Sequence, residues 1–579
     1  MCGISAIYGK NTSDFGLIKN LVNDLKHRGP DNSKILKINE NLIFGHNRLK
    51  IIDLSNKSNQ PFSNKNVNLI FNGVIYNYIE LKKEIERENF YNFKTKSDTE
   101  VVLASYLRWG DACFGKFVGM FSIVLWDKNK NKLLCVRDKL GIKPLYFSFK
   151  NKNLILSSEI SPINNIYKSK IDETVLSDYL NYSMYEHSEK TFFKKIKQIE
   201  PGFIYKFSVN NNYERYKYWS LFDLIKNNEN KTKKIDQKIT LERIKERINI
   251  IQKHYIRSDV KTLNLLSSGL DSYYLTKLLL KNDNNLKLLM SFGFETDEKD
   301  ETLMIKKTSK MKKIKHKIII FNCEQFLKNL DKIQLQQEGP WGGPNTFFCN
   351  DLLNYAKNKN FKVAYNGDGA DEIFGGYKKY LSPLVSNDNL VNKNFFLKHI
   401  DGSFTNKENL LKKNFLKSFK DYNNYLKVPS RKSIHNQRFL DIVYNKLPRN
   451  FRFSDRFSMH NSIELRYPFL DTKLIELSFN LDKSNLISNK KNKILLRNYV
   501  PEYSTTSKKH INSPQTEWLQ RPIMIEYLNK RLKDSPIFDK YFDKVRTLNF
   551  LENFSKRKMK NSFIVWQIIN LDLFMRNFF

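Results

Sequence analysis

Cys2 is the residue near the start of the chain whose type and position could do chemistry. Because its side chain is small, an aminopeptidase is expected to remove Met1 and to leave one residue that carries both a thiol and a free α-amine. An α-amine titrates at about pH 8, so it can take the proton of the thiol without a histidine, as in enzymes with an N-terminal nucleophile. The alternative is that the segment only begins a buried strand. Residues further along the chain favour the nucleophile.

A series of short motifs follows Cys2 in a fixed order. They are HRGPD (His27–Asp31), GHNRLKIIDLS (Gly45–Ser55), FNGVIYN (Phe71–Asn77), KSDTEV (Lys96–Val101), GMFSIVLWD (Gly119–Asp127), VRDKLGIKPLY (Val136–Tyr146) and SSE (Ser157–Glu159). Each motif alone is weak. Together with Cys2, the ordered set resembles the glutaminase domain of class II glutamine amidotransferases, and most closely the asparagine synthetase family.

The resemblance implies a role for several residues. Hydrolysis of glutamine passes through a tetrahedral oxyanion, which needs hydrogen-bond donors that are fixed in advance. The family takes them from an Asn-Gly pair, which matches Asn72 and Gly73, and glycine also lets the backbone approach closely. The glutamine carboxylate is expected to bind the guanidinium of Arg48, and the glutamine α-ammonium to bind Asp98. The predicted catalytic residues of this half are Cys2, Asn72 and Gly73, and the predicted glutamine-binding residues are Arg48, Asn72, Gly73 and Asp98.

One residue departs from the family pattern. The family usually has a glutamate directly after the Asn-Gly pair, which helps to hold the α-amine of glutamine, whereas this chain has Val74. Asp98 or a backbone carbonyl could compensate, and use of free ammonia is a further alternative. The sequence therefore predicts that Val74→Glu lowers the KM for glutamine and leaves the ammonia-dependent rate unchanged.

A second motif, KTLNLLSSGLDSYYLTKLLL (Lys261–Leu280), has the pattern of a strand, a tight turn and a helix. Residues 263–266 predict a short buried strand, residues 273–280 predict a helix, and small residues at 267–272 connect them. Such a loop offers backbone N–H groups and a positive helix dipole to an anion. It resembles the SGGLDS pyrophosphate loop of N-type ATP pyrophosphatases. No Gly-Lys-Ser/Thr sequence follows, so transfer of a γ-phosphate is not expected. The residues expected to bind ATP are Leu266, Ser267, Ser268 (in place of the first glycine), Gly269, Leu270, Asp271, Ser272 and Gly367.

An acidic cluster, NGDGADEIFGGY (Asn366–Tyr377), follows the apolar run 361–365. Mg²⁺ prefers oxygen ligands and is usually held by one or two carboxylates together with phosphate oxygens. In the family, the aspartate of the pyrophosphate loop and the last aspartate of this cluster bind magnesium pyrophosphate. This implies Asp271 and Asp371 as the metal ligands here. Asp368 matches an acid that acts near the acyl intermediate.

Two later motifs, DRFSMHNSIELRYPFLD (Asp455–Asp471) and NKILLR (Asn492–Arg497), also resemble the synthetase domain of this family. Lys493 aligns with the lysine that stabilises charge while the acyl-adenylate forms and breaks down. With Asp368 it completes the predicted catalytic set. Glu464 and Arg466 are interpreted as structural residues.

The order of the motifs predicts two domains. Residues 1–206 are expected to form the glutaminase domain, which in the family is an α+β sandwich of antiparallel sheets of the N-terminal-nucleophile type. Residues 207–234 are expected to connect it to an asparagine-synthetase-like domain at 235–579, an α/β fold with a parallel sheet of the ATP-pyrophosphatase type. Apolar runs at 263–266, 288–292, 317–321 and 362–365 alternate with helical stretches, as a doubly wound sheet requires. The tail beyond about residue 514 predicts only packing helices. A homodimer is left open as the assembly.

Composition limits the partners. A formal net charge of +39 over 579 residues suggests nucleic acid, but the lysines are dispersed among asparagines and isoleucines, and no nucleic-acid motif accompanies them. A/T-rich codon usage is the simpler explanation. No apolar run of membrane-spanning length occurs, and no secretory signal begins the chain. The cysteines (2, 113, 135, 323 and 349) have no paired spacing, which indicates a reducing compartment. A cytoplasmic location is predicted, with neither nucleic acid nor membrane as partner.

The predicted substrates are glutamine, ATP and a small carboxylate, with Mg²⁺ as the metal ion. Cys2 would release ammonia from glutamine through a thioester, and the acceptor would attack the α-phosphorus of ATP to give an acyl-adenylate and pyrophosphate. Ammonia, carried by an intramolecular channel that the resemblance implies, would then displace AMP. Aspartate, giving asparagine, is the leading acceptor. The segment QQEGPWGGPNT (Gln336–Thr346) departs from the commonest asparagine-forming pattern. Another carboxylate, such as a sugar acid in surface polysaccharide biosynthesis, and an ammonia-dependent variant are therefore kept as alternatives.

Overall fold

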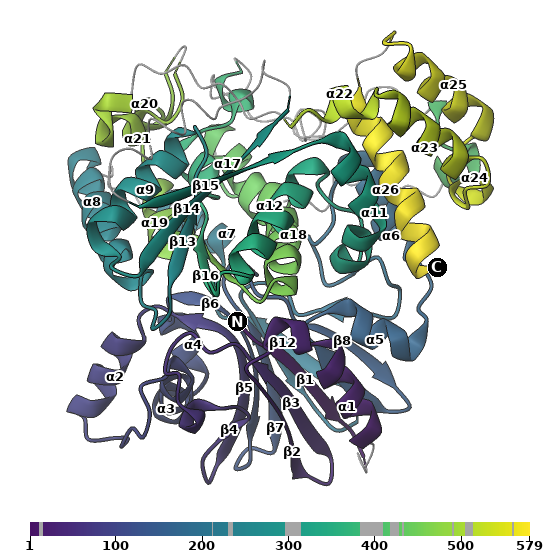
Figure 1. Cartoon of the computed structure of the whole chain (residues 1–579). Helices are drawn as coiled ribbons and strands as arrows, with labels where there is room; N and C mark the ends of the chain where they lie inside the picture. The colour runs from purple at the N-terminus through teal and green to yellow at the C-terminus, as the bar shows by residue number, and fades with distance from the viewer. Residues whose placement is uncertain are drawn as a thin grey trace.

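A computed structural model describes residues 1–10, 15–210, 212–229, 236–295, 314–382, 409–416, 428–430, 433–488, 491–503, 513–558 and 561–579. Within these ranges the chain forms an N-terminal half (to residue 217) and a C-terminal half. In Figure 1 the N-terminal half lies below the C-terminal half. No helix in the described part of the chain is long and apolar enough to cross a membrane.

The N-terminal half contains two six-stranded sheets, with the strand orders β10-β8-β9-β1-β3-β2 and β12-β11-β7-β6-β5-β4. Neighbouring strands run antiparallel. The strands are β1 (Gly3–Tyr8), β2 (Asn32–Asn39), β3 (Leu42–Arg48), β4 (Phe62–Ser63), β5 (Val67–Ile75), β6 (Gly119–Asp127), β7 (Lys132–Arg137), β8 (Tyr146–Lys150), β9 (Asn153–Ser157), β10 (Lys197–Gln198), β11 (Phe203–Phe207) and β12 (Tyr213–Lys217). The helices are α1 (Phe15–Asp24), α2 (Tyr78–Arg87), α3 (Asp98–Trp109), α4 (Cys113–Lys116), α5 (Ile160–Tyr167) and α6 (Glu173–Tyr182).

The central strands of the two sheets, such as β1, β3 and β6, are buried on both faces. Their inner faces pack against each other through Ile4, Phe44, Ile70 and Val124. Helices α1 and α5 cover the outer face of the first sheet, and α2 and α3 cover the outer face of the second. All residues of β1 are therefore buried, which explains why this strand reads as an apolar run rather than as an alternating pattern. The predicted antiparallel sandwich of the N-terminal-nucleophile type is confirmed.

The C-terminal half is built on a five-stranded sheet with the order β15-β14-β13-β16-β17, in which neighbouring strands run parallel. Its strands are β13 (Thr262–Leu265), β14 (Leu286–Phe294), β15 (Lys315–Phe321), β16 (Val363–Tyr365) and β17 (Glu464–Arg466). The first four were predicted from their apolar runs, and the predicted parallel sheet is confirmed. Because β13 and β16 are neighbours, the loops at their carboxyl ends meet at one edge of the sheet.

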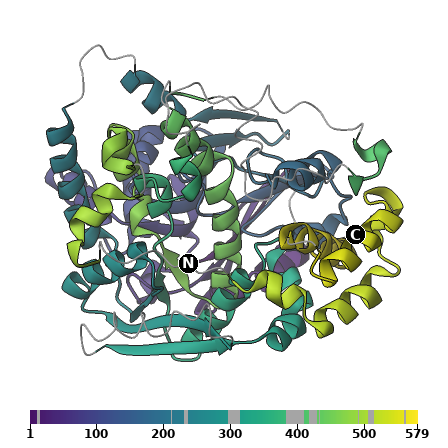
Figure 2. The same ribbon diagram turned by 90° about the horizontal axis from the view of Figure 1, so that it is seen from above.

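Helices surround this sheet and continue into the tail, where α23 to α26 form a group of their own beside it (Figure 2). They are α7 (Leu221–Glu229), α8 (Gln237–His254), α9 (Leu270–Asn282), α11 (Cys323–Gln337), α12 (Pro344–Lys357), α13 (Ala370–Phe374), α16 (Lys413–Leu416), α17 (Ser433–Val443), α18 (Lys446–His460), α19 (Thr472–Ser478), α20 (Lys483–Leu486), α21 (Ile494–Tyr499), α22 (Gln515–Leu519), α23 (Pro522–Leu532), α24 (Ile537–Lys540), α25 (Lys544–Ser555) and α26 (Ser562–Phe578).

Two boundaries differ from those expected from the sequence. Strand β12 lies in the segment predicted as a connector, but it pairs with β11 along its whole length, so the second sheet extends to Lys217. Its sequence is polar because it lies at the sheet edge and is largely exposed. Helix α9 begins at Leu270 rather than at Tyr273, because the end of the small-residue loop already forms the first turn.

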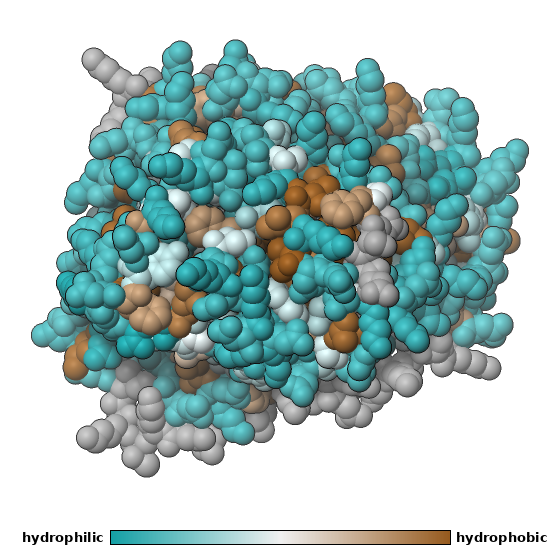
Figure 3. Space-filling model, turned by 90° about the horizontal axis from the view of Figure 1, so that it is seen from below, coloured by the Kyte–Doolittle hydropathy of each residue, from teal (hydrophilic) through white to brown (hydrophobic). Residues whose placement is uncertain are grey.

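The underside of the molecule is the outer surface of the N-terminal half. Figure 3 shows this face, and hydrophilic side chains cover most of it, with apolar side chains in small groups between them. Scattered apolar groups of this kind are normal on a protein surface.

Candidate functional site

The N-terminus lies at the boundary between the two halves (Figure 1). The backbone N–H of Cys2 donates to Asn72 Oδ1, on β5, at 3.0 Å. After removal of Met1 this nitrogen would be the α-amine, so the bond orients the predicted base beside the thiol. The other amide atom of Asn72, Nδ2, is buried and has no hydrogen-bond partner among the described residues. A buried donor of this kind is costly unless it serves a ligand, and it suits an oxyanion that develops beside Cys2.

Gly73 and Val74 continue the wall of the site along β5. Strand pairing places Gly73 opposite Phe121 and Val74 opposite Met120. A Cβ at Gly73 would overlap the carbonyl oxygen of Met120, so this close approach of two strands requires glycine. Val74 is buried and lines the same cavity as Cys2. The structure therefore places the departure from the family pattern inside the predicted glutamine site.

The two charged residues predicted to bind glutamine line the cavity as well. In the described chain the guanidinium of Arg48 donates only to neutral oxygens, with Nη1 2.7 Å from the carbonyl oxygen of Ser55. Its charge is therefore available to a substrate carboxylate. Asp98 is the first residue of α3, and its Oδ2 accepts from the N–H of Ile75 at 3.1 Å.

Met1 lines the cavity beside Cys2. This cavity has a volume of about 30 Å³, enough for about two water molecules. Glutamine is much larger than this cavity, and the expected removal of Met1 would enlarge it. Burial raises the pKa of the Cys2 thiol, and the N-terminal ammonium acts in the opposite direction. With Met1 in place the thiol is protonated at neutral pH.

The charge of Asp98 predicts a pH dependence of glutamine use. Burial raises the pKa of the Asp98 carboxyl to about 7. A raised pKa means that the carboxylate is lost as the pH falls through this value, and a neutral Asp98 cannot pair with an ammonium. The part of kcat/KM for glutamine that depends on Asp98, taken as the ratio of wild type to Asp98→Asn, should therefore be level above about pH 7 and fall about tenfold per pH unit below it. Glutaminase assays across this range measure the profile. If the fall in kcat/KM below about pH 7 were the same in Asp98→Asn as in the wild type, Asp98 would not be its cause.

The loop after β13 has the geometry of an anion-binding turn. The N–H of Ser267 donates to Ser272 Oγ at 3.1 Å, and the N–H of Gly269 donates to Ser267 Oγ at 3.1 Å. These bonds hold the loop at the N-terminus of α9, where backbone N–H groups and the helix dipole favour an anion.

Most residues predicted to bind ATP line the cleft beside this loop, which has a volume of about 870 Å³. That volume is within the usual range for a ligand site. Two of the predicted residues lie elsewhere. Ser268 uses its carbonyl to accept from the hydroxyl of Tyr503, and Leu270 packs in the apolar core. The predicted residues that line the cleft are Leu266, Ser267, Gly269, Asp271, Ser272 and Gly367.

Lys493 joins the two predicted metal ligands. Its Nζ lies 2.5 Å from Asp271 Oδ2 and 2.5 Å from Asp371 Oδ1. Burial opposes the charge of this ammonium, but the two carboxylates outweigh burial and raise the pKa of Lys493. Its backbone is left-handed, with φ +55°, a conformation that costs a lysine about 1 kcal/mol or more. Three separate segments of the chain are thus held together at this point.

The same two carboxylates fit a single Mg²⁺. Both approach one Nζ atom at 2.5 Å, so they lie close enough to share one cation, and Mg²⁺ needs only one or two carboxylates when phosphate oxygens complete its shell. Asp368 lies on the same loop, with its Oδ2 2.8 Å from Asn366 Nδ2. Burial, together with the charge of Asp371, raises the pKa of Asp368 to about 6.

Gly376 lets Lys493 reach the aspartates. A Cβ at this position would overlap both Asp371 Oδ1 and Lys493 Cε. The substitution Gly376→Ala should therefore separate the pair and lower ATP-dependent pyrophosphate formation at least ~tenfold, or about 1.4 kcal/mol of barrier. Glutamine hydrolysis should not change. The assay is pyrophosphate release under saturating ATP.

The matched control is Gly115→Ala. A Cβ at Gly115, in α4, meets no atom within 4 Å, so this variant should keep both activities. Equal pyrophosphate formation by the wild type and both variants would show that contact between Lys493 and Asp371 is not needed at the ATP site.

Buried ion pairs join the two halves beside Cys2. Arg28, in the HRGPD motif, donates through Nε to the carbonyl oxygen of Cys2 at 3.1 Å. Its Nη1 donates to Glu159 Oε1 at 2.6 Å and to Asp455 Oδ2, in the C-terminal half, at 2.9 Å. The backbone of the predicted nucleophile is thus fixed by a residue that the C-terminal half holds in place.

The segment Gln336–Thr346 supports the cleft and also lines it. Trp341 is buried, and its Nε1 donates to Gln334 Oε1 at 3.0 Å. It therefore stabilises the segment rather than contacting the cleft. The residues of this segment that line the cleft are Gly342, Asn345 and Thr346.

Several residues that line the two cavities were not predicted from the sequence. Glu372 belongs to the acidic cluster that was recognised, and burial raises the pKa of its carboxyl to about 8. Its neighbours in that motif were the signal that could have identified it. Glu464 had no such signal, because only the tertiary structure brings it to Cys2. The missed residues are Gln60, Thr99 and Glu464 in the small cavity, and Glu372, Lys378, Lys446 and Asn450 in the cleft.

Comparison with known proteins gives matches over both halves. The family described as "Glutamine amidotransferase domain" matches residues 1–219, and the family described as "Asparagine synthase" matches residues 247–576. The chain is similar to asparagine synthetase (glutamine-hydrolyzing) 1 of Bacillus subtilis, with 29% identity over 99% of this chain and 97% of that protein. Asparagine synthetase (glutamine-hydrolyzing) 3 of the same organism is 26% identical over 86% and 84%. Amidase chry2 of Gibberella zeae is 28% identical over 67% and 61%.

Proposed function

The chain belongs to the asparagine synthase family, and we propose that it transfers ammonia from glutamine to aspartate, with release of AMP and pyrophosphate. That it is a glutamine-hydrolysing enzyme of the asparagine synthase type, with glutamine and ATP as substrates, follows from the two family matches. The identity of the acceptor and the roles of single residues are the proposal. The observation that carries the proposed transfer of ammonia is a buried apolar cluster that reaches both the cavity at Cys2, through Val74, and the ATP cleft, through Leu266.

The first half-reaction takes place at Cys2. The thiol gives its proton to the α-amine that Asn72 Oδ1 orients, and the sulfur attacks the side-chain amide carbon of glutamine. Asn72 and Gly73 supply donors to the oxyanion, while Arg48 and Asp98 hold the two ends of the amino acid. The proton then leaves with ammonia, and water cleaves the thioester to glutamate.

The second half-reaction takes place in the cleft. The loop at the N-terminus of α9 binds the phosphates of ATP, and the acceptor carboxylate attacks the α-phosphorus, so that the bond to pyrophosphate breaks. Asp271 and Asp371 would hold Mg²⁺, which when bound neutralises charge on the phosphates. Lys493 stabilises negative charge at the same place. Ammonia attacks the acyl carbon, and AMP leaves.

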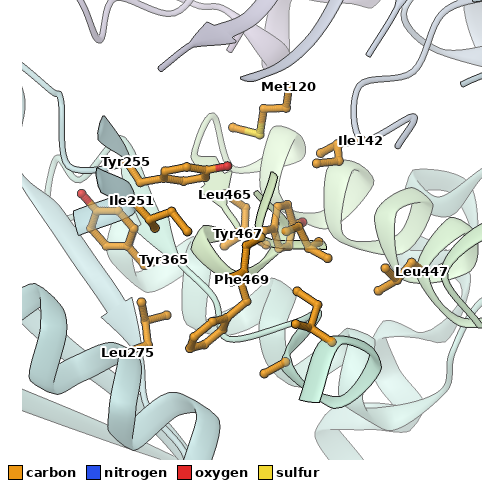
Figure 4. Close-up of a cluster of buried hydrophobic side chains, with 14 of the residues drawn as sticks. Met120, Ile142, Ile251, Tyr255, Leu275, Tyr365, Leu447, Leu465, Tyr467 and Phe469 are labelled. Atoms are coloured by element: carbon orange, nitrogen blue, oxygen red, sulfur yellow. The ribbon is translucent and has the colours of Figure 1, made fainter. Parts of the chain in front are cut away.

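The apolar cluster lies between the two sites. Figure 4 shows Met120 and Ile142 of the N-terminal half above Leu465 and Tyr467 of the C-terminal half, and all four are buried. Burial of an unpaired charge is costly, so this environment favours neutral ammonia over ammonium. The cluster supports an intramolecular route by which ammonia reaches the acyl-adenylate away from bulk water.

The acceptor is tested by a screen of carboxylates. Aspartate is favoured because the similar proteins that cover most of the chain are named asparagine synthetases. A different acceptor, such as a sugar acid, is the second candidate, because the segment around Trp341 is unusual and one similar protein is named an amidase. Pyrophosphate and AMP release from ATP is measured with glutamine or ammonium and each carboxylate. Release with aspartate, together with asparagine formation, supports the proposal. If pyrophosphate and AMP are released only with another carboxylate, that carboxylate is the acceptor.

A further inference from the structure

The C-terminal half contributes one acidic side chain to the cavity at Cys2. Glu464 is the first residue of β17, and its side chain lines this cavity together with Arg48, Val74 and Asp98. It is only 2% exposed. A residue from the far half of the chain therefore forms part of the wall of the predicted glutamine site.

The cavity has to hold both charged ends of glutamine. Arg48 can take the carboxylate, and Asp98 is one partner for the α-ammonium. The position after the Asn-Gly pair offers no second carboxylate, because it is Val74. Among the described residues that line the cavity, Asp98 and Glu464 are the ones with a carboxylate.

We propose that Glu464 binds the α-ammonium of glutamine and so supplies the carboxylate that Val74 cannot. This inference rests on the proposed hydrolysis of glutamine at Cys2. It changes the interpretation of Glu464 from a structural residue to one that contacts the substrate.

Glu464 is held in one orientation for this contact. Its Oε1 accepts from Arg466 Nε at 2.6 Å. The Nη1 of Arg466 in turn donates to the carbonyl oxygens of Tyr255 at 2.7 Å and Arg257 at 2.8 Å. The guanidinium is therefore fixed, and Oε2 is the carboxylate oxygen that lies near the amine of Met1. A carboxylate that is already positioned loses little conformational entropy when it binds an ammonium.

Met1 shows that an amino-acid amine fits beside this carboxylate. The α-ammonium of Met1 lies 3.7 Å from Glu464 Oε2. Burial lowers the pKa of this amine, and Glu464 is the strongest influence in the other direction. Once Met1 has been removed, both the space and the charged partner become available to the α-ammonium of glutamine.

The position of Glu464 also links the glutamine pocket to the parallel sheet. Strand β17 pairs with β16 through Val363 and Glu464, and β16 leads into the loop that carries Asp368 and then into α13, which carries Asp371. The glutamine pocket is thus complete only when the two halves are in contact.

The test is the variant Glu464→Gln assayed with two substrates. Glutamine in this variant can still accept from Arg466 Nε, so the fold is preserved, but the negative charge is lost. Hydrolysis of L-glutamine is compared with hydrolysis of glutaramate, which has the same amide and carboxylate but no α-amine. We expect kcat/KM for L-glutamine to fall ~tenfold or more, and kcat/KM for glutaramate to change less than about threefold.

The matched control is Glu338→Gln. Glu338 is another buried glutamate at the contact between the halves, paired with Arg456 at 2.7 Å, and it does not line the cavity. Its loss should affect the two substrates equally. An equal fall for both substrates in Glu464→Gln, or no fall for either, would overturn the proposal. A wild-type enzyme that hydrolyses neither substrate would instead contradict the proposed function itself.

Val74→Glu provides a second and independent arm. If Glu464 already supplies the carboxylate, the substitution adds a third acid to a buried cavity, and the KM for glutamine should stay the same or rise. The sequence alone predicts the opposite result. A KM for glutamine that falls tenfold in Val74→Glu would show that the pocket lacks a second carboxylate, and the proposal would then be wrong.

Discussion

Replacement of Cys2 by alanine should abolish glutamine-dependent synthesis and leave ammonia-dependent synthesis intact. The thiol is the proposed attacking group, and no other described side chain in its cavity is a thiol. Loss of a covalent nucleophile removes roughly a thousandfold of rate or more. The ATP cleft is lined by separate residues, so ammonium salts should still give amide product. Product formation from each nitrogen source is measured with saturating ATP and acceptor.

The control for this prediction is Cys135→Ala. Cys135 is buried between the sheets and belongs to the core rather than to the cavity, so its loss should leave both nitrogen sources usable. A folded Cys2→Ala enzyme that fails with ammonium as well would show that the two sites are not separable. Glutamine-dependent synthesis that persists in Cys2→Ala would exclude Cys2 as the nucleophile.

Much of the fold could be predicted because the informative patterns are local. The strand before the SSGLDS loop and the loop itself occupy adjacent residues, so their apolar run and small side chains indicate a strand and an anion-binding turn directly. The same holds for the strand before Asn366. Strand β12 could not be predicted in this way. It is an exposed edge strand with polar side chains, and it forms because it can pair with β11.

The residues proposed for the two sites could be predicted where they belong to a local sequence motif. Asn72 and Arg48 are identified by their motifs, and the structure places both at Cys2. The contact between Lys493 and the two aspartates could not be predicted, because it joins three distant segments and depends on a left-handed backbone at Lys493. Glu464 illustrates the same limit. Its motif resembles that of a synthetase domain, yet its side chain lines the cavity at Cys2, and only the packing of the two halves reveals this.

Removal of one charge from the acidic pair should stop ATP chemistry without stopping glutamine hydrolysis. Asp271→Asn and Asp371→Asn each keep the shape of the side chain but delete one of the two carboxylates that contact Lys493 at 2.5 Å. Each variant should lower pyrophosphate formation ~100-fold or more, or about 2.7 kcal/mol of barrier. Glutaminase activity should persist, because Cys2 lies in a separate cavity. Pyrophosphate, AMP and glutamate are measured in parallel.

The outcome also discriminates between ways of activating the acceptor. In each of these two variants the ammonium of Lys493 keeps one charged partner. The lower rate is therefore expected to come from weaker binding of metal and phosphate rather than from loss of folding. Raising the Mg²⁺ concentration should therefore recover part of the rate in either variant. The control is Asp31→Asn, which should retain pyrophosphate formation. Asp31 pairs with Lys362 at 2.7 Å between the halves and lies outside the cleft. If the wild-type enzyme released ADP instead of AMP, the acceptor would attack the γ-phosphorus. The proposal that these two aspartates support adenylation would then be wrong.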